Sequence, residues 1–325
     1  MQGLKPFTGI YSALATPFDR EGAVDVSLLL NTMAWQSTPK RSSLDEVPDQ
    51  AKRGVDGFVL YGTTGEAPTL SLQDKELITV SALERAPQLP LIAGIGTNCT
   101  RSSAELAKYA RSWGAHAGLL VTPYYNKPSQ EGLYRHVCEV AEAVPDWPLI
   151  LYVVPARTAV HLDLETVGRI LDRCSQVCSI KDATGDLDYC GALVELLQGR
   201  ATVLSGDDLT ALPAWTLGAR GSISVCSNLI PHQFSGMWSL HQSGQREGAA
   251  DLFSQLLPLI EALFIETNPA PLKSALNWAA QRGLLTGIET WSPELRLPLC
   301  ALSEANQLTL HEVLSLHFRE TLEGK

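Results

Sequence analysis

Eight short apolar runs recur along the first 225 residues, and this repetition constrains the fold more than any other feature of the chain. The runs are Gly9–Pro17, Gly57–Gly62, Leu91–Gly96, Gly118–Pro123, Pro148–Pro155, Val177–Lys181, Ala201–Gly206 and Gly221–Val225. The middle runs are about 30 residues apart, which is the length of one βα unit. Their apolar residues are continuous rather than alternating, as in parallel strands buried on both faces.

The segments between several of these runs have helical patterns. Apolar residues from Leu133 to Val144 fall on one helical face. Ser102 followed by Glu105 predicts a capping box at the start of another helix. Eight strand-then-helix units predict an α/β fold of the (β/α)8 TIM-barrel type, with a doubly wound sheet as the competing architecture.

The strand pattern ends near Pro231, and helical patterns occupy the rest of the chain. We therefore expect two parts, a barrel over residues 1–235 and a C-terminal helical region over residues 236–325 that packs on the barrel. The polar stretch Ser37–Arg53 contains two prolines and interrupts the pattern. It predicts a surface excursion on the face of the barrel opposite the chemistry.

Composition excludes several classes of protein. The formal net charge of −10 and the pI near 5.2 argue against nucleic acid or an anionic membrane as a partner. No apolar run reaches the roughly 18 residues of a membrane span, and the first residues lack the layout of a secretion signal. Seven cysteines without a C-x-x-C pair predict reduced thiols in a cytoplasmic protein. The seven histidines form no ligand set that predicts a metal.

The sixth apolar run ends on a single lysine, Lys181, and turn-forming residues follow it directly. Burial at the end of an apolar strand disfavours the charged ammonium group. A neutral amine can attack a carbonyl carbon and form a Schiff base. The alternative is a solvated lysine at a strand end.

Candidate functional residues also follow other runs. Thr63 and Thr64 lie in a glycine-flanked turn, where hydroxyl and backbone N–H groups could bind a carboxylate; the alternative is a turn that caps the next helix. Tyr125 and Tyr134 follow the fourth run and offer phenols for proton transfer, unless they serve only in packing. Arg157 follows the fifth run and suits a carboxylate, or else a surface ion pair.

These residues together predict an imine between a lysine and a 2-oxo acid. The strings that contain them are G-T-T-G-E, V-T-P-Y-Y-N-K-P-S-Q-E-G-L-Y, L-Y-V-V-P-A-R-T, S-I-K-D-A-T-G-D-L and L-S-G-D-D. As a set they resemble the dihydrodipicolinate synthase family of the N-acetylneuraminate lyase superfamily. The resemblance runs from about Phe7 to the C-terminal helices.

The resemblance implies four catalytic residues. Lys181 matches the lysine that forms the Schiff base with pyruvate. Tyr134 matches the tyrosine that shuttles protons, and Thr64 and Tyr125 match its partners in a proton relay. In the family, the tyrosine matched by Tyr125 comes from the neighbouring subunit.

Four further positions match substrate-binding residues. Thr63 matches a contact to the pyruvate carboxylate, and Arg157 matches the arginine that holds the carboxylate of aspartate semialdehyde. Gly206 and Ile223 match positions that line the site. Val153 departs from the family, which commonly has asparagine at this position.

The resemblance implies a lyase that condenses pyruvate with L-aspartate 4-semialdehyde to hydroxy-tetrahydrodipicolinate, in the diaminopimelate route of lysine biosynthesis. It implies no cofactor beyond the covalent imine, and a homo-oligomer, either dimer or tetramer. A related pyruvate-dependent aldolase or dehydratase that acts on a sugar-acid or other aldehyde is the first alternative. A non-catalytic, metabolite-binding barrel is the second.

Overall fold

The computed structural model describes residues 5–38, 54–86 and 88–323. Most of the predicted excursion Ser37–Arg53 therefore lies outside the described residues. All seven cysteines lie within them, and all are free thiols, as predicted. Within the same ranges, no helix combines the length and the apolar character needed to cross a bilayer.

The chain divides into two compact units, each built from several segments of the sequence. The first, here called the barrel unit, comprises Met1–Tyr11, Gly57–Leu60 and Pro87–Ser224. The second, here called the helical unit, comprises Ser12–Asp56, Tyr61–Ala86 and Val225–Lys325. The C-terminal helices therefore share a unit with segments from the start of the chain, which no local sequence pattern indicated.

Eight parallel strands close into a barrel in which each strand neighbours the next along the chain. They are β1 (Gly9–Ala13), β2 (Gly57–Leu60), β3 (Leu91–Gly94), β4 (Ala117–Val121), β5 (Leu149–Val153), β6 (Val177–Asp182), β7 (Thr202–Ser205) and β8 (Gly221–Ser224). All eight predicted strands and the (β/α)8 fold are confirmed. Every residue of β1, β2, β5, β6 and β8 is buried, which explains the continuous apolar runs.

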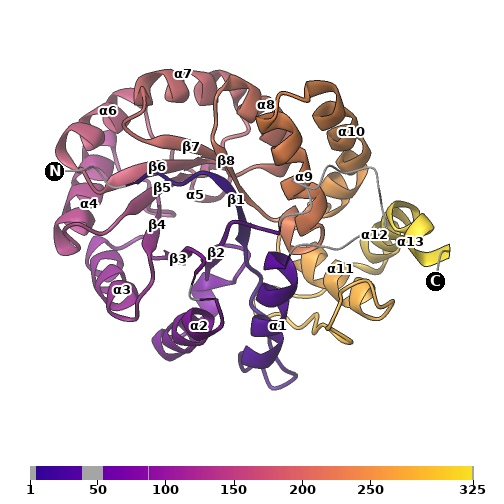
Figure 1. The fold of residues 1–325 in the computed structure, drawn as a ribbon. Helices are drawn as coiled ribbons and strands as arrows, with labels where there is room; N and C mark the ends of the chain where they lie inside the picture. The colour runs from indigo at the N-terminus through magenta and orange to yellow at the C-terminus, as the bar shows by residue number, and fades with distance from the viewer. Residues whose placement is uncertain (1–4, 39–53, 87, 324–325) are drawn as a thin grey trace. The chain divides into compact units, whose positions relative to one another are not determined.

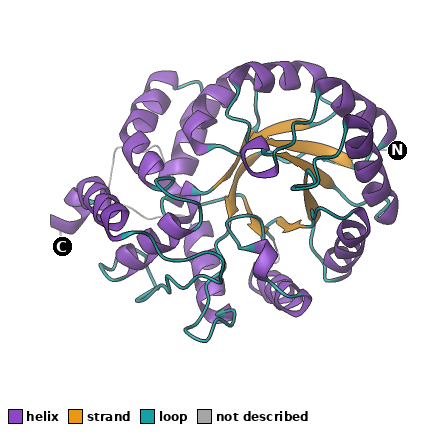
Figure 2. Cartoon of the chain, turned by 180° about the vertical axis from the view of Figure 1, so that it is seen from behind, coloured by secondary structure: helices purple, strands orange, loops and turns teal. Residues whose placement is uncertain are grey.

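The helices of the barrel unit are α3 (Thr100–Ser112), α4 (Gln130–Ala143), α5 (Pro155–Thr158), α6 (Leu164–Arg173), α7 (Leu187–Leu197) and α8 (Ala211–Leu217), with the 3-10 turn η3 (Asp208–Thr210). The longer ones lie outside the strands, while the short α5 lies over the middle of the strand ring (Figures 1 and 2). The helical face predicted from Leu133 to Val144 is α4. The predicted capping box is wrong, because α3 begins two residues before Ser102, with Cys99 at its N-cap.

The helical unit contains α1 (Val26–Ser37), η2 (Ala67–Thr69), α2 (Leu72–Arg85), η4 (Cys226–Asn228), α9 (Pro231–Gln242), α10 (Arg246–Ala262), α11 (Ala270–Ala280), α12 (Glu304–His317) and α13 (Arg319–Glu323). Within this unit α10 packs against α9 and α12, and α1 packs against α2 and α9. The fully buried Trp291 donates its indole N–H to Thr32 Oγ1 at 3.1 Å. Ser71 and Asp74 form a capping box that begins α2.

Candidate functional site

Lys181 lies at the C-terminal end of β6, where its side chain is only 6% exposed. Its Nζ atom is 4.1 Å from the centre of the Tyr152 ring. The strand register explains this contact, because Tyr152 of β5 and Lys181 of β6 are direct partners. Among the described residues, no hydrogen bond or carboxylate engages this nitrogen. The alternative of a solvated lysine is therefore wrong, and an amine is held in a buried, largely apolar setting.

Gly206 provides the space that the Lys181 side chain occupies. A Cβ atom at this position would lie 2.7 Å from Lys181 Cε and 2.9 Å from Lys181 Cγ, closer than van der Waals contact allows. The Gly206 N–H donates to the carbonyl oxygen of Asp182 at 2.6 Å, which holds the turn after β7 against the end of β6. The structure thus brings Gly206 and Lys181 together.

The last residue of β6, Asp182, is a buried carboxylate that the sequence analysis did not single out. Asp182 is 6% exposed, and its Oδ1 accepts a hydrogen bond from the Thr184 N–H at 3.0 Å. Burial raises the pKa of this carboxyl, although the Thr184 bonds oppose the shift. Ala183 donates its N–H to the carbonyl oxygen of Val153 at 2.9 Å. These bonds fix the backbone immediately after Lys181.

Tyr134 lies in the first half of α4. The guanidinium carbon of Arg169, from α6, is 4.3 Å from the centre of its ring. A hydrogen bond with the Cys138 thiol, one turn further along α4, raises the pKa of its phenol. The structure places Tyr152 against Lys181, whereas Tyr134 contacts Arg169, and the role that the resemblance gives to Tyr134 stays a prediction.

Sequence reasoning gave the proton-shuttling role to Tyr134 through the family resemblance and gave no role to Tyr152. The signal that identifies it is strand register. A tyrosine three residues before the end of a predicted strand was treated as part of an apolar run. Only the pairing of β5 with β6 shows that this side chain meets the lysine.

The other predicted residues of the barrel unit occupy three different settings. Arg157 lies on α5 and is exposed. Its neighbour Thr158 is buried and accepts a hydrogen bond from Thr122 Oγ1 at 3.3 Å, which ties α5 to the end of β4. Tyr125 is 88% exposed and has a left-handed backbone, with φ of 75°. Ile223 is fully buried in β8.

Thr63 and Thr64 belong to the helical unit, in the turn that follows β2. Thr64 is 2% exposed, and its Oγ1 accepts a hydrogen bond from Asn268 Nδ2 at 2.9 Å. Gly65 lies where a Cβ would be 2.9 Å from Tyr61 Cα, so a side chain at this position would clash with the backbone. Thr16 Oγ1 donates to the Gly65 carbonyl oxygen at 2.9 Å. The threonine pair is thus part of a turn fixed by its own unit.

Comparison with known proteins shows which family this chain resembles over nearly its whole length. A model of the dihydrodipicolinate synthetase family matches residues 6–317. The 4-hydroxy-tetrahydrodipicolinate synthase of Thermodesulfovibrio yellowstonii is 40% identical over 309 residues, which cover 95% of this chain and 97% of the relative.

Solved structures of similar proteins cover nearly the whole chain. Dihydrodipicolinate synthase from Thermotoga maritima superposes with a TM-score of 0.85 at 35% identity, over 96% of this chain and 98% of the other. The chloride-inhibited enzyme from Acinetobacter baumannii, solved in complex with pyruvate, gives a TM-score of 0.83 at 38% identity, over 95% and 98% of the two chains. This chain belongs to the dihydrodipicolinate synthetase family.

Proposed function

We propose that this protein is a lyase that condenses pyruvate with L-aspartate 4-semialdehyde to hydroxy-tetrahydrodipicolinate, in lysine biosynthesis. The observation that carries the proposal is the setting of Lys181, a buried amine at the end of a barrel strand that lies over the ring of Tyr152. Barrel enzymes bear their chemistry at this end of the strands. The names of the relatives agree with this reaction.

The proposed chemistry begins with attack of the Lys181 amine on the carbonyl carbon of pyruvate. Loss of one water molecule gives an imine, and loss of a proton from the methyl carbon gives an enamine. That carbon then forms a bond to the aldehyde carbon of the second substrate, whose oxygen takes up a proton. The amino group of the condensed product displaces the lysine and closes the ring. No external cofactor is needed for these steps.

We assign the proton shuttle to Tyr152 instead of Tyr134, because a phenol must lie within reach of the atoms whose protons it moves. Thr64 and Tyr125 remain the proposed partners in the relay. The 88% exposure of Tyr125 suits a side chain that reaches into the site of a neighbouring subunit.

We assign substrate binding to the four other predicted positions. Thr63 would hold the pyruvate carboxylate through its hydroxyl group. Arg157 would hold the carboxylate of the aldehyde, for which its exposed position on α5 leaves room. Gly206 and Ile223 would line the site around the lysine. We further propose that the protein acts in the cytoplasm as a homo-oligomer, a dimer or a tetramer.

Borohydride reduction in the presence of pyruvate tests the proposal directly. Reduction of the imine should attach the three carbons of pyruvate to Lys181, and peptide mass mapping should locate them there. Lys181→Met provides the matched control and should yield no adduct. The absence of an adduct in the parent would instead favour a non-catalytic barrel that binds a metabolite.

A second assay identifies the aldehyde. The parent should turn over pyruvate with L-aspartate 4-semialdehyde faster than with aldehydes derived from sugar acids. A preference for a polyol aldehyde would show that the imine chemistry is right and the second substrate is wrong.

A further inference from the structure

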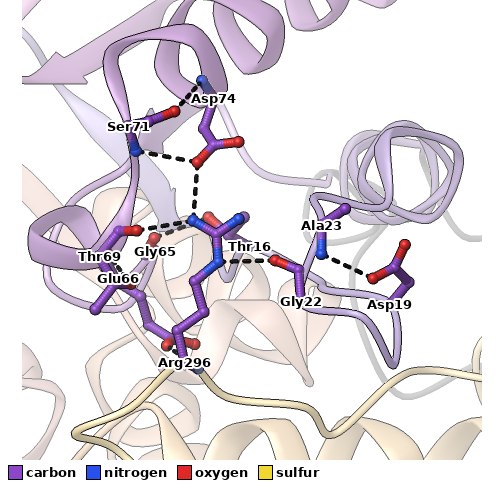
Figure 3. A network of polar contacts seen from close by, with 10 residues as sticks. All are labelled: Thr16, Asp19, Gly22, Ala23, Gly65, Glu66, Thr69, Ser71, Asp74 and Arg296. Atoms are coloured by element: carbon purple, nitrogen blue, oxygen red, sulfur yellow. Dashed lines mark hydrogen bonds and ion pairs between the residues drawn. The ribbon is translucent and has the colours of Figure 1, made fainter.

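Three side chains from the last quarter of the chain hold the turn that carries Thr63 and Thr64. They are Asn268, Lys273 and Arg296, and we call them the C-terminal clasp. All three belong to the helical unit, as does the turn Gly62–Thr69. Figure 3 shows the part of this network around Arg296.

Arg296 contributes the largest number of bonds to the clasp. Its backbone N–H donates to Glu66 Oε2 at 3.1 Å, and its Nη1 donates to the Thr69 carbonyl oxygen at 2.8 Å. The same Nη1 donates to Asp74 Oδ2 at 2.8 Å, while Nε donates to the Gly22 carbonyl oxygen at 2.8 Å. The guanidinium thus joins the Thr69 end of the turn to α2 and to the loop that contains Gly22, while the backbone N–H reaches Glu66 (Figure 3). A lysine could replace only part of this fork of donors.

Lys273 is fully buried and contacts the turn through Glu66. It forms an ion pair with Glu66, and its Nζ donates to the Glu294 carbonyl oxygen at 2.8 Å. Glu66 has a left-handed backbone, with φ of 55°, which a side-chain-bearing residue adopts only when its surroundings hold it there. The pair with Lys273 and the bond from Arg296 provide this restraint on the residue that follows Gly65.

Asn268 acts on Thr64 itself. Its Nδ2 donates to Thr64 Oγ1 at 2.9 Å, so one acceptor position of this hydroxyl is already occupied. The Thr64 hydrogen is therefore directed elsewhere, and the hydroxyl can serve as a donor. A donor is what a substrate carboxylate or a proton relay requires at this position.

We propose that Asn268, Lys273 and Arg296 are positioning residues that preset the Thr63–Thr64 turn to receive the carboxylate of the 2-oxo acid. The inference rests on the proposed function, and it adds residues more than 200 positions away in sequence to the machinery for substrate selection. Preorganisation of this kind lowers the cost of ordering the binding groups when the substrate arrives.

The test compares two ligands that share a ketone but differ in charge, pyruvate and its neutral amide, pyruvamide. Both can form an imine on Lys181, and only pyruvate offers a carboxylate. The rate of borohydride-trapped adduct is measured with each ligand, and the parent should favour pyruvate. Arg296→Met should lower this preference by about tenfold, because a hydrogen bond to a charged group contributes that much or more. Arg296→Lys should show an intermediate loss.

Controls separate positioning from general damage. Arg200→Met removes an exposed arginine that pairs with Asp172, outside the clasp, and should leave the preference unchanged. A purely structural role for Arg296 would slow trapping equally with both ligands and would overturn the inference. Should Arg296→Met not fold, Asn268→Ala tests the same point through Thr64, and an unchanged preference there also overturns it. Failure of the parent to trap pyruvate on Lys181 would refute the proposed function instead.

Discussion

Two buried lysines occupy the two units of this protein, and they are buried in opposite ways. Lys273 of the helical unit is fully enclosed, forms an ion pair with Glu66, donates to a backbone carbonyl and lies 4.2 Å from the centre of the Phe18 ring. Lys181 of the barrel unit is 6% exposed and has the Tyr152 ring at 4.1 Å. Among the described residues, it has no carboxylate partner.

The difference separates a structural lysine from a reactive one. A buried charge with a carboxylate and a carbonyl partner is compensated, and its removal leaves the partner uncompensated. Replacement of a buried amine that lies beside an aromatic ring and has no carboxylate partner breaks no ion pair, and its nitrogen can form a bond to a carbonyl carbon. Burial alone therefore does not identify the reactive lysine, whereas the set of partners does.

The same substitution at the two lysines should have opposite consequences. Lys181→Met should reduce condensation on the order of 10⁴-fold or more, because the atom that bonds to pyruvate is gone. Its free energy of unfolding should not fall, since no ion pair is broken. Steady-state kinetics and urea unfolding measure the two effects. A Lys181→Met variant that retains turnover would show that Lys181 is not the reactive lysine.

Lys273→Met should instead destabilise the fold by about 3–5 kcal/mol, because it leaves Glu66 charged and buried without its partner. Urea unfolding measures this loss. The double variant Glu66→Gln/Lys273→Met should lose less than the single variant, since it removes both charges together. Equal losses in the two variants would show that the ion pair is not what makes Lys273 structural.

The contact between Lys181 and Tyr152 leads to a prediction about the two tyrosines. Tyr152→Phe should lower kcat by roughly 10²–10⁴-fold, as expected for removal of a general acid–base group. Tyr134 contacts Arg169, not Lys181. The kcat of Tyr134→Phe should therefore remain within about twofold of the parent value. The reverse ranking would restore the role that the sequence analysis gave to Tyr134.

Strands were easier to predict than contacts. All eight strands followed from nearly continuous apolar runs, since a parallel strand that is buried on both faces is apolar along most of its length. Lys181 stood out because it ends such a run. Tyr152 did not, because its contact depends on the register between β5 and β6, and register is a property of two strands that neither one carries alone.

The helical unit was the least predictable part of the molecule. Its members come from both ends of the chain, and the clasp joins Arg296 to Thr69 and Gly22 through contacts separated by more than 200 residues. No local periodicity records such contacts. The assigned roles of Thr63, Arg157 and Tyr125 come from the family resemblance and stay predictions.

The smallest expected effect concerns the proton on Lys273. Burial lowers the pKa of this lysine to about 8, although the Glu66 carboxylate opposes the shift. An unfolded lysine has a pKa of about 10.4, so the unfolded chain holds one more proton between those two values. The free energy of unfolding must then rise with pH in that interval, by at most about 1.4 kcal/mol per pH unit, while below pH 8 both states are protonated and the contribution is constant.

Other groups titrate in the same range, so the informative quantity is the difference in unfolding free energy between the parent and Lys273→Met, measured in urea from pH 7 to 9.5. That difference should be flat below pH 8 and should grow in favour of the parent above it. A flat line throughout would mean that Glu66 and the Glu294 carbonyl fully offset the burial of the ammonium group. The structural role of Lys273 would then rest on its ion pair and its hydrogen bond alone, with no contribution from a shifted pKa.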